Sequence, residues 1–338
     1  MKTLDEKLTL YLERAKDFFP GINSSSSFSM FNTDLQSEPT SGEIELSGRF
    51  INDKTLKEGS VQFIHYTSLT SAMNILNSGK VRLYNCLNLN DPSEIKNLLD
   101  QSPIEFSDDE TEQYKREHFI LSGSLFSNIE DEDFNLWRLY GDNSTGIGIV
   151  FEVNETLQNW GNIYLQKVDY QSDNTNLIYD YLNFHKEFND EHHLFHNKPD
   201  FFPLLATGVK SNIWSIEKEI RVVIHAPFDR YSLKSEDKLT TNRLISDTLQ
   251  HEYKPNGNLV SFVEIPLHLN DRQSKKVNLP LTQKEVDLID YVPNLRIKKV
   301  ILGPNSPFKK KSQFLDYELW LQKKLKYDFE VHLSSIKL

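Results

Sequence analysis

The sequence predicts an α+β fold, with a mixed, mainly antiparallel sheet and peripheral helices. Short apolar or alternating runs typical of strands recur across residues 61–333, and helical patterns interrupt them in an irregular order. A regular alternation of strand and helix, which would build a doubly wound parallel sheet, is absent. We therefore expect one α+β domain over residues 61–338.

Residues 1–60 are expected to form an N-terminal helical arm and linker. Apolar residues recur near helical spacing over residues 4–19, and Pro20-Gly21 ends the pattern. The stretch that follows is polar and rich in serine, and it contains Pro39 and Gly42. This composition favours a flexible link or a partly ordered wrap over a second domain.

The first half of the domain opens with a strand, a helix and a strand. The helix has Thr67 or Ser68 at its cap and Gly79 at its end. The expected elements are strands at residues 61–66, 80–84, 120–126 and 146–153, helices at 69–78 and 133–140, and a hairpin partner of the last strand at 162–168.

The second half centres on a strand at residues 214–225. Further strands are expected at 259–267, 298–302 and 329–333, with an amphipathic helix at 311–324 before the last one. Two insertions are expected, near residues 170–203 and near residues 227–256.

Charge and composition argue against several classes of protein. The chain has 338 residues with a net charge of -11, which weakens the case for nonspecific nucleic-acid binding. The segment from Arg296 to Lys326 has an excess of basic residues. This excess is typical of a solvated helix face and loop or, alternatively, of a surface that contacts a polyanion. Cys86 is the single cysteine, so an intrachain disulfide is excluded. A single cysteine gives no sign of an oxidising compartment and cannot form a multi-thiolate zinc site, so we expect a cytoplasmic protein without a metal. Without a long apolar run, we expect no membrane contact.

Residues 214–224 carry the most informative pattern. A period of two places Glu217, Glu219 and Arg221 on one face of the expected strand, and apolar side chains on the other. Carboxylates beside a guanidinium tune one another's pKa, which is useful in a cleft. The alternative is an exposed strand with cross-strand salt bridges.

Aromatic and polar residues elsewhere are candidates for the same cleft. The first strand ends in His65, Tyr66 and Thr67, which alone would also fit a hydrogen-bonded core histidine and a capping threonine. Three more rings lie at the ends of expected elements and could stack on a flat ligand: Tyr84, Trp137 and Tyr140.

Six motifs in order resemble the bacterial family known as domain of unknown function 2971. They are FIHYTSLTSAMNILNSGKVRL, NLNDPSE, SLFS, LWRLYGDNSTGIGIVFEV, WSIEKEIRVV and KKVILGPNS, and they extend from residue 63 toward the end of the chain. More weakly, the His-Tyr-Thr strand, the helix ending in glycine and the late glutamate are similar to the ADP-ribosyltransferase superfamily. That second resemblance implies a split sheet.

The ADP-ribosyltransferase resemblance implies NAD-dependent ADP-ribosyl transfer or NAD glycohydrolysis, as in a bacterial toxin or defence effector. It implies that His65 holds the adenosine ribose of NAD, that Tyr84 or Tyr140 stacks on nicotinamide, and that Glu217 or Glu219 orients the nicotinamide ribose. The remaining NAD-binding candidates are Tyr66, Thr67, Trp137 and Arg221. We favour Glu219 for catalysis, because it lies between Glu217 and Arg221 on one face.

Two other functions remain open. A noncatalytic nucleotide- or protein-binding module would use the same cleft without turnover. A metal-dependent nuclease could use Asp91, Glu94 and Lys96, a grouping that can hold Mg²⁺. Pro92 and the expected helix start do not suit the strand geometry of such a nuclease site.

Overall fold

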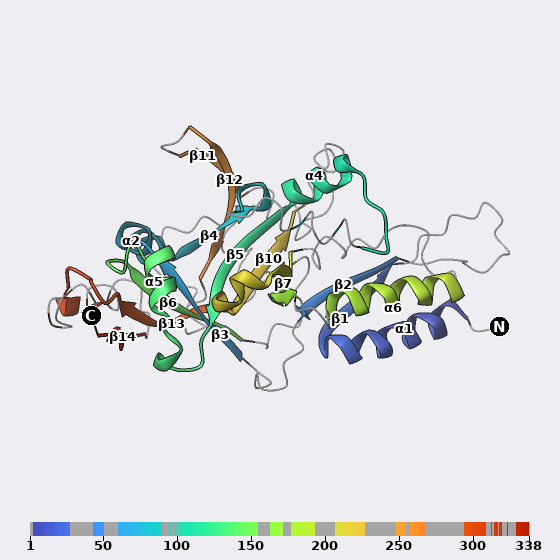
Figure 1. Ribbon diagram of the computed structural model, residues 1–338, viewed down its shortest axis with the longest axis horizontal. Coiled ribbons are helices and arrows are strands. Elements are labelled where there is room, and N and C mark those ends of the chain that lie inside the picture. Colours follow the sequence, from blue (N-terminus) through green and yellow to red (C-terminus); the bar gives the residue numbers. More distant parts are fainter. Residues whose placement is uncertain are drawn as a thin grey trace.

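The computed structural model confirms the predicted α+β class, with a mainly antiparallel open sheet and several helices (Figure 1). It describes residues 3–27, 43–50, 60–89, 102–154, 163–171, 177–192, 207–226, 248–254, 257–267, 294–308 and 329–337, with single positions or short pieces at 95, 99, 312, 314–316, 318, 319 and 323.

Nine strands follow one another across the main path of the large sheet. In spatial order they are β1 (Gly21–Ser27), β2 (Glu43–Phe50), β7 (Ile163–Lys167), β10 (Glu219–His225), β5 (His118–Leu125), β3 (Ser60–Thr67), β6 (Ile147–Asn154), β13 (Asn294–Leu302) and β14 (Glu330–Leu333). Within this path, the pairs β2–β7 and β13–β14 are parallel and the other described pairs are antiparallel. Strand β10 therefore lies near the centre, as expected.

The sheet divides at β5. Near its end, β5 pairs with β3 through Leu125 and Ser124, whereas near its start it pairs with β4 (Lys80–Asn85) through Ile120 and Phe119. Strand β4 continues the branch to β12 (Leu259–Pro266) and β11 (Leu249–Tyr253), which project from the body in Figure 1. Residues 121–123 lie between the two pairings, so β3 and β4 diverge there.

Local signals explain the connection between β3 and β4. The Ser68 side chain accepts a hydrogen bond from the Ser71 amide and caps α2 (Leu69–Ser78). Gly79 ends the helix in a left-handed conformation, with φ of 67°. The strand, helix and strand expected at the start of the domain are therefore present.

The core lies on both faces of β10. Ile220, Val222 and Ile224 belong to one apolar cluster, and Val223 belongs to a second cluster with α1 (Leu4–Phe18) and α6 (Leu177–His192). These two helices lie side by side (Figure 1), and the hydroxyls of Tyr11 and Tyr181 are 2.6 Å apart.

Residues 1–60, expected to form an arm and linker, contribute α1, β1 and β2. A domain boundary at residue 60 stays a prediction. Helix α6 falls in the first expected insertion. In the second, residues 227–247 lie outside the described part, and residues 249–253 form β11.

Two expectations about strands were wrong. The strand expected from residue 214 begins at Glu219, because a 3₁₀ turn (Asn212–Glu217) precedes it and Lys218 adopts a left-handed conformation with φ of 43°. Strand β7 does not form a hairpin with β6, because β3 and β13 occupy the two edges of β6. It pairs with β10 and β2 instead.

The remaining elements connect and cover the sheet. They are α4 (Asp108–Glu117), α5 (Phe134–Tyr140), 3₁₀ turns at Cys86–Asn88 and Ile129–Asp131, and a two-stranded sheet of β8 (Asp169–Gln171) and β9 (Val209–Ser211). Among the helices in the described ranges, none has the length and apolar character needed to cross a membrane.

Candidate functional site

Two adjoining cavities open where the sheet divides. The small chamber, of about 200 Å³, is lined by Tyr140, Lys210, Glu217, Glu219 and Arg221 among others. The large chamber, of about 750 Å³, extends between α2 and β4. His65, Leu89 and Ser122 line both, so the chambers meet at the point where β3 and β4 diverge.

Three buried ionisable side chains and the largely buried Lys210 form one network in the small chamber. The Arg221 guanidinium donates to Glu219 through Nε at 2.8 Å and through Nη2 at 2.9 Å. Lys210 Nζ lies 2.6 Å from a Glu217 oxygen and 3.3 Å from a Glu219 oxygen. Two cations therefore face two carboxylates, and these four charges sum to zero.

Glu219 is held in its ionised form. Burial alone would raise the pKa of its carboxyl, but Arg221, Lys210 and the Ser122 side chain outweigh burial and lower the pKa to about 2. Glu219 and Arg221 are two residues apart on β10, so they share a face of the strand. In the sheet, Glu219 on β10 lies opposite Ser124 on β5.

Arg221 connects this network to the neighbouring strands. Its guanidinium also donates to the Thr207 carbonyl, and the Thr207 hydroxyl donates to Gln166 on β7 at 2.8 Å. The Glu219 backbone N–H donates to the Tyr170 hydroxyl at 2.8 Å. Residues before β9 and on β8 therefore fix the start of β10.

Glu217 reaches the same chamber from the 3₁₀ turn. The Tyr140 hydroxyl at the end of α5 donates to one of its oxygens, and Lys210 binds the other. Burial raises the pKa of Tyr140, and the Glu217 carboxylate raises it further, so the phenol stays protonated. Lys210 Nζ also lies 5.2 Å from the centre of the Trp214 ring.

His65 is a neutral imidazole between the two chambers. Its Nδ1 lies 2.8 Å from the Ser122 carbonyl oxygen, which can only accept, so Nδ1 carries the proton. Burial lowers the pKa of His65, and the bond to Ser122 offsets only part of this effect. Nε2 is then an acceptor that can receive a hydrogen bond from a ligand hydroxyl.

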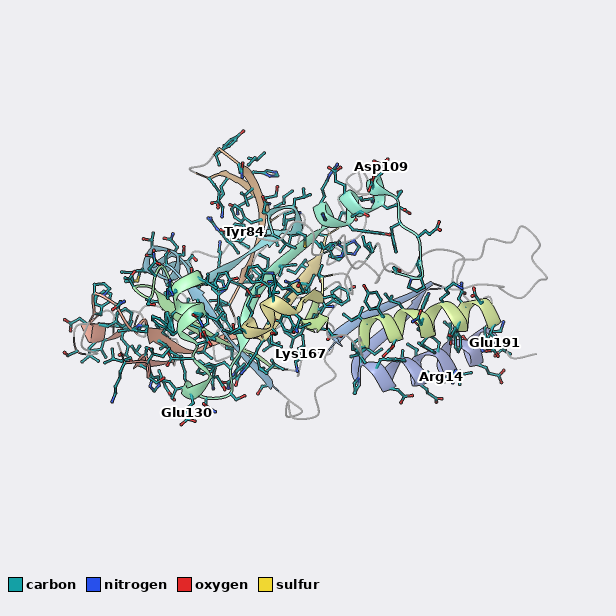
Figure 2. All side chains as sticks on the ribbon, in the orientation of Figure 1. Arg14, Tyr84, Asp109, Glu130, Lys167 and Glu191 are labelled. Atoms are coloured by element: carbon teal, nitrogen blue, oxygen red, sulfur yellow. The ribbon has the colours of Figure 1, made fainter. Side chains whose placement is uncertain are left out.

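The structure brings together most of the residues that the sequence singled out. Six line the small chamber: His65, Tyr66, Tyr140, Glu217, Glu219 and Arg221. Thr67 and Tyr84 line the large chamber, and Figure 2 shows Tyr84 at the branch formed by β4 and β12. Trp137 lines neither. It is fully buried, with its ring 4.8 Å from Tyr66 and its Nε1 donating to Glu132 at 2.9 Å.

Sequence reasoning missed several residues of the site: Lys210, Tyr170, Ser122, Ser124 and Gln166. A signal existed for some of them. The serines interrupt the apolar run of β5, and Gln166 interrupts that of β7. Lys210 carries no such signal, because β9 is only three residues long.

The other candidate regions add little to this site. Asp91, Glu94 and Lys96 lie outside the described residues. Within the described ranges, no group of three or more histidine, cysteine, aspartate or glutamate residues could hold a metal ion. In the basic segment, Lys298 pairs with Glu152 at 3.7 Å and Lys299 pairs with Glu330 at 3.7 Å. Most other basic residues of residues 296–326 lie outside the described part.

Comparisons with known proteins support one of the two resemblances. Residues 136–222 match the model of a family described as "Protein of unknown function (DUF2971)", and this stretch contains Tyr140, Lys210, Glu217, Glu219 and Arg221. No curated protein and no solved structure matches the chain. The similarity to ADP-ribosyltransferases stays a prediction.

Proposed function

We propose that the protein cleaves the bond between nicotinamide and ribose in NAD and passes ADP-ribose to an acceptor or to water. The observation that supports this most is the small chamber, where Glu219, ionised at neutral pH, lies beside Glu217 and the neutral His65. The adjoining large chamber gives an extended dinucleotide room to lie across the divided sheet.

The chemistry requires a fixed negative charge. When the C1′–N bond breaks, its electron pair leaves with nicotinamide, and positive charge develops on the ribose ring. A carboxylate that is already oriented stabilises this charge without reorganising. Glu219 meets that requirement because Arg221 holds both of its oxygens in place.

The two glutamates suit different steps. With its pKa lowered to about 2, Glu219 remains an anion at neutral pH and is a poor proton acceptor. Glu217 is held by one donor on each oxygen. We assign to Glu217 the role of general base: when an oxygen or nitrogen of the acceptor attacks C1′, Glu217 takes the proton that this atom loses.

His65 and Tyr140 would position the substrate. The His65 Nε2 acceptor can receive a hydrogen bond from a ribose hydroxyl at the junction of the chambers. Of Tyr84 and Tyr140, the two candidates for stacking on nicotinamide, Tyr140 lines the small chamber, so it is our choice for contact with the nicotinamide ring.

One observation favours a second candidate, a noncatalytic nucleotide- or protein-binding module. Arg221 and Lys210 already satisfy much of the hydrogen-bonding capacity of the Glu219 carboxylate. A carboxylate whose oxygens are already hydrogen-bonded can line a binding site without contributing to turnover. Binding and cleavage of NAD must therefore be measured separately.

The test incubates the purified full chain with NAD and follows nicotinamide release by chromatography, with calorimetry for NAD binding. Glu219→Gln is expected to lower release by about 10²–10³-fold. Glu152→Gln is the matched control, because Glu152 is a strand glutamate that bonds Gln62 and Lys298 and lines neither chamber. NAD binding without release would favour a module that binds the nucleotide. Neither binding nor release would reject the proposed NAD chemistry and favour a module with another ligand.

A further inference from the structure

The large chamber is a cavity whose helical wall carries no charge. Helix α2 buries Ala72 and Leu76 in the core, and it lines the chamber with Ser71, Asn74, Asn77 and Ser78. None of the ten residues of α2 is charged. Partly exposed helices usually carry charged residues on the side away from the core, as α4 does.

Amides and hydroxyls define the chemistry of a suitable ligand. Each asparagine side chain offers two donors and one acceptor oxygen, and each serine hydroxyl donates and accepts. Such groups match the hydrogen-bonding edge of a purine base, as asparagine does with adenine, and the hydroxyls of a ribose. They offer little to a ligand that is recognised mainly by charge.

On the opposite wall, which Lys80 also lines, Arg82 is bound by two carboxylates. Arg82 donates to Glu264 at 3.0 Å and to Glu252 at 2.7 Å. Tyr84, half-buried on β4, has Lys254 Nζ 4.7 Å from the centre of its ring. These ion pairs reduce what Arg82 can offer to a phosphate and leave more of the recognition to the neutral groups of α2.

We infer that the large chamber binds the adenosine half of NAD, with Asn74 and Asn77 of α2 reading the base. This inference rests on the proposed function for its ligand. A volume of about 750 Å³ is within the usual range for small-molecule sites. The shared lining residues His65 and Ser122 place the chamber next to the carboxylates.

The test uses the double variant Asn74→Ala/Asn77→Ala and two readouts. Calorimetric titration with AMP measures the chamber directly, and the ratio of KM for NAD to KM for nicotinamide mononucleotide measures its use in turnover. Losing two neutral hydrogen bonds predicts an AMP affinity about tenfold weaker and a KM ratio about tenfold higher. Asn183→Ala is the matched control, an exposed asparagine on α6, and it should behave as wild type.

The outcomes separate this inference from the proposed function. Weaker AMP binding by the double variant than by the wild type supports the inference, whether or not nicotinamide is released. If AMP binds in this way but no nicotinamide is released, the proposed function is rejected and the inference stands. Equal AMP affinity in the double variant and the wild type, or no AMP binding to either, overturns the inference. Circular dichroism melting of each variant verifies that the fold is retained.

Discussion

Arg221 is the residue on which the small chamber depends most, because its buried guanidinium neutralises Glu219 and also bonds the Thr207 carbonyl. Arg221→Met removes the charge but keeps most of the volume, and it leaves a buried carboxylate with fewer donors. We expect a loss of about 3–5 kcal/mol in the free energy of unfolding, measured by urea denaturation.

A surface lysine provides the control for this prediction. Lys298 forms a partly exposed pair with Glu152 at 3.7 Å, so Lys298→Met is expected to cost less than about 1 kcal/mol. If Arg221→Met and Lys298→Met cost the same, the buried network has no special role in stability.

The sequence identified part of the site for a physical reason. Glu219, Arg221 and His65 are polar residues within short apolar strands, a pattern that is costly unless such residues have partners or a function. Glu217 was named for a position on the strand, yet it reaches the chamber from the 3₁₀ turn. Lys210 could not be predicted, because its place depends on the pairing of β9 with β8.

Among the secondary-structure elements, the close approach of β3 to β5 depends on Gly123. A Cβ atom at this position would lie 2.8 Å from the Ile64 carbonyl oxygen and 2.4 Å from the Phe63 ring. Gly123→Ala therefore forces the backbone of β3 away from β5. We expect a loss of about 1–3 kcal/mol in unfolding free energy by urea denaturation, together with weaker NAD binding.

Gly148→Ala is the matched control on β6. The nearest atom to its added Cβ would be the end of the flexible Ile64 side chain, at 2.7 Å, which can move more cheaply than backbone. A smaller loss of stability is expected there. An equal or larger loss at Gly148 would contradict the role assigned to Gly123.

Elements were easier to predict than their partners. Capping residues and apolar periodicity are local, so α2, α5 and β6 appear close to their expected ranges. One partner of β7 is β10, which begins more than fifty residues later in the sequence, and no local pattern encodes that pairing. The same limit explains why the start of β10 was placed too early: Lys218 takes a left-handed conformation that a period of two does not reveal.

For the whole molecule, buried imidazoles predict how stability changes with pH. Burial lowers the pKa of His185 to about 4. This histidine lies between α1 and α6, and its Nδ1 is hydrogen-bonded to the Tyr11 hydroxyl. Between pH 6.5 and 4 the unfolded chain binds more protons, so stability is full above pH 6.5 and falls as the pH drops. The shift corresponds to about 3 kcal/mol.

Urea unfolding at pH 7.5 and pH 4.5 measures this effect. His185→Gln should lose less stability than wild type between the two pH values. His251→Gln, at an exposed position on β11, should lose as much as wild type. If His185→Gln and wild type show the same pH dependence, His185 is not a source of the acid sensitivity.

The place of β5 between β10, β3 and β4 also has a consequence for synthesis. Its partners β3 and β4 precede it in the chain, but β10 begins at residue 219, 94 residues after β5 ends at residue 125. At about 5–20 residues per second, a ribosome needs roughly 5–20 seconds to cover that distance. During this interval one edge of β5 has no native partner strand and is open to wrong pairing. The nascent chain also lacks Glu217, Glu219 and Arg221 during this interval, so the small chamber is completed only after residue 221 has been synthesised.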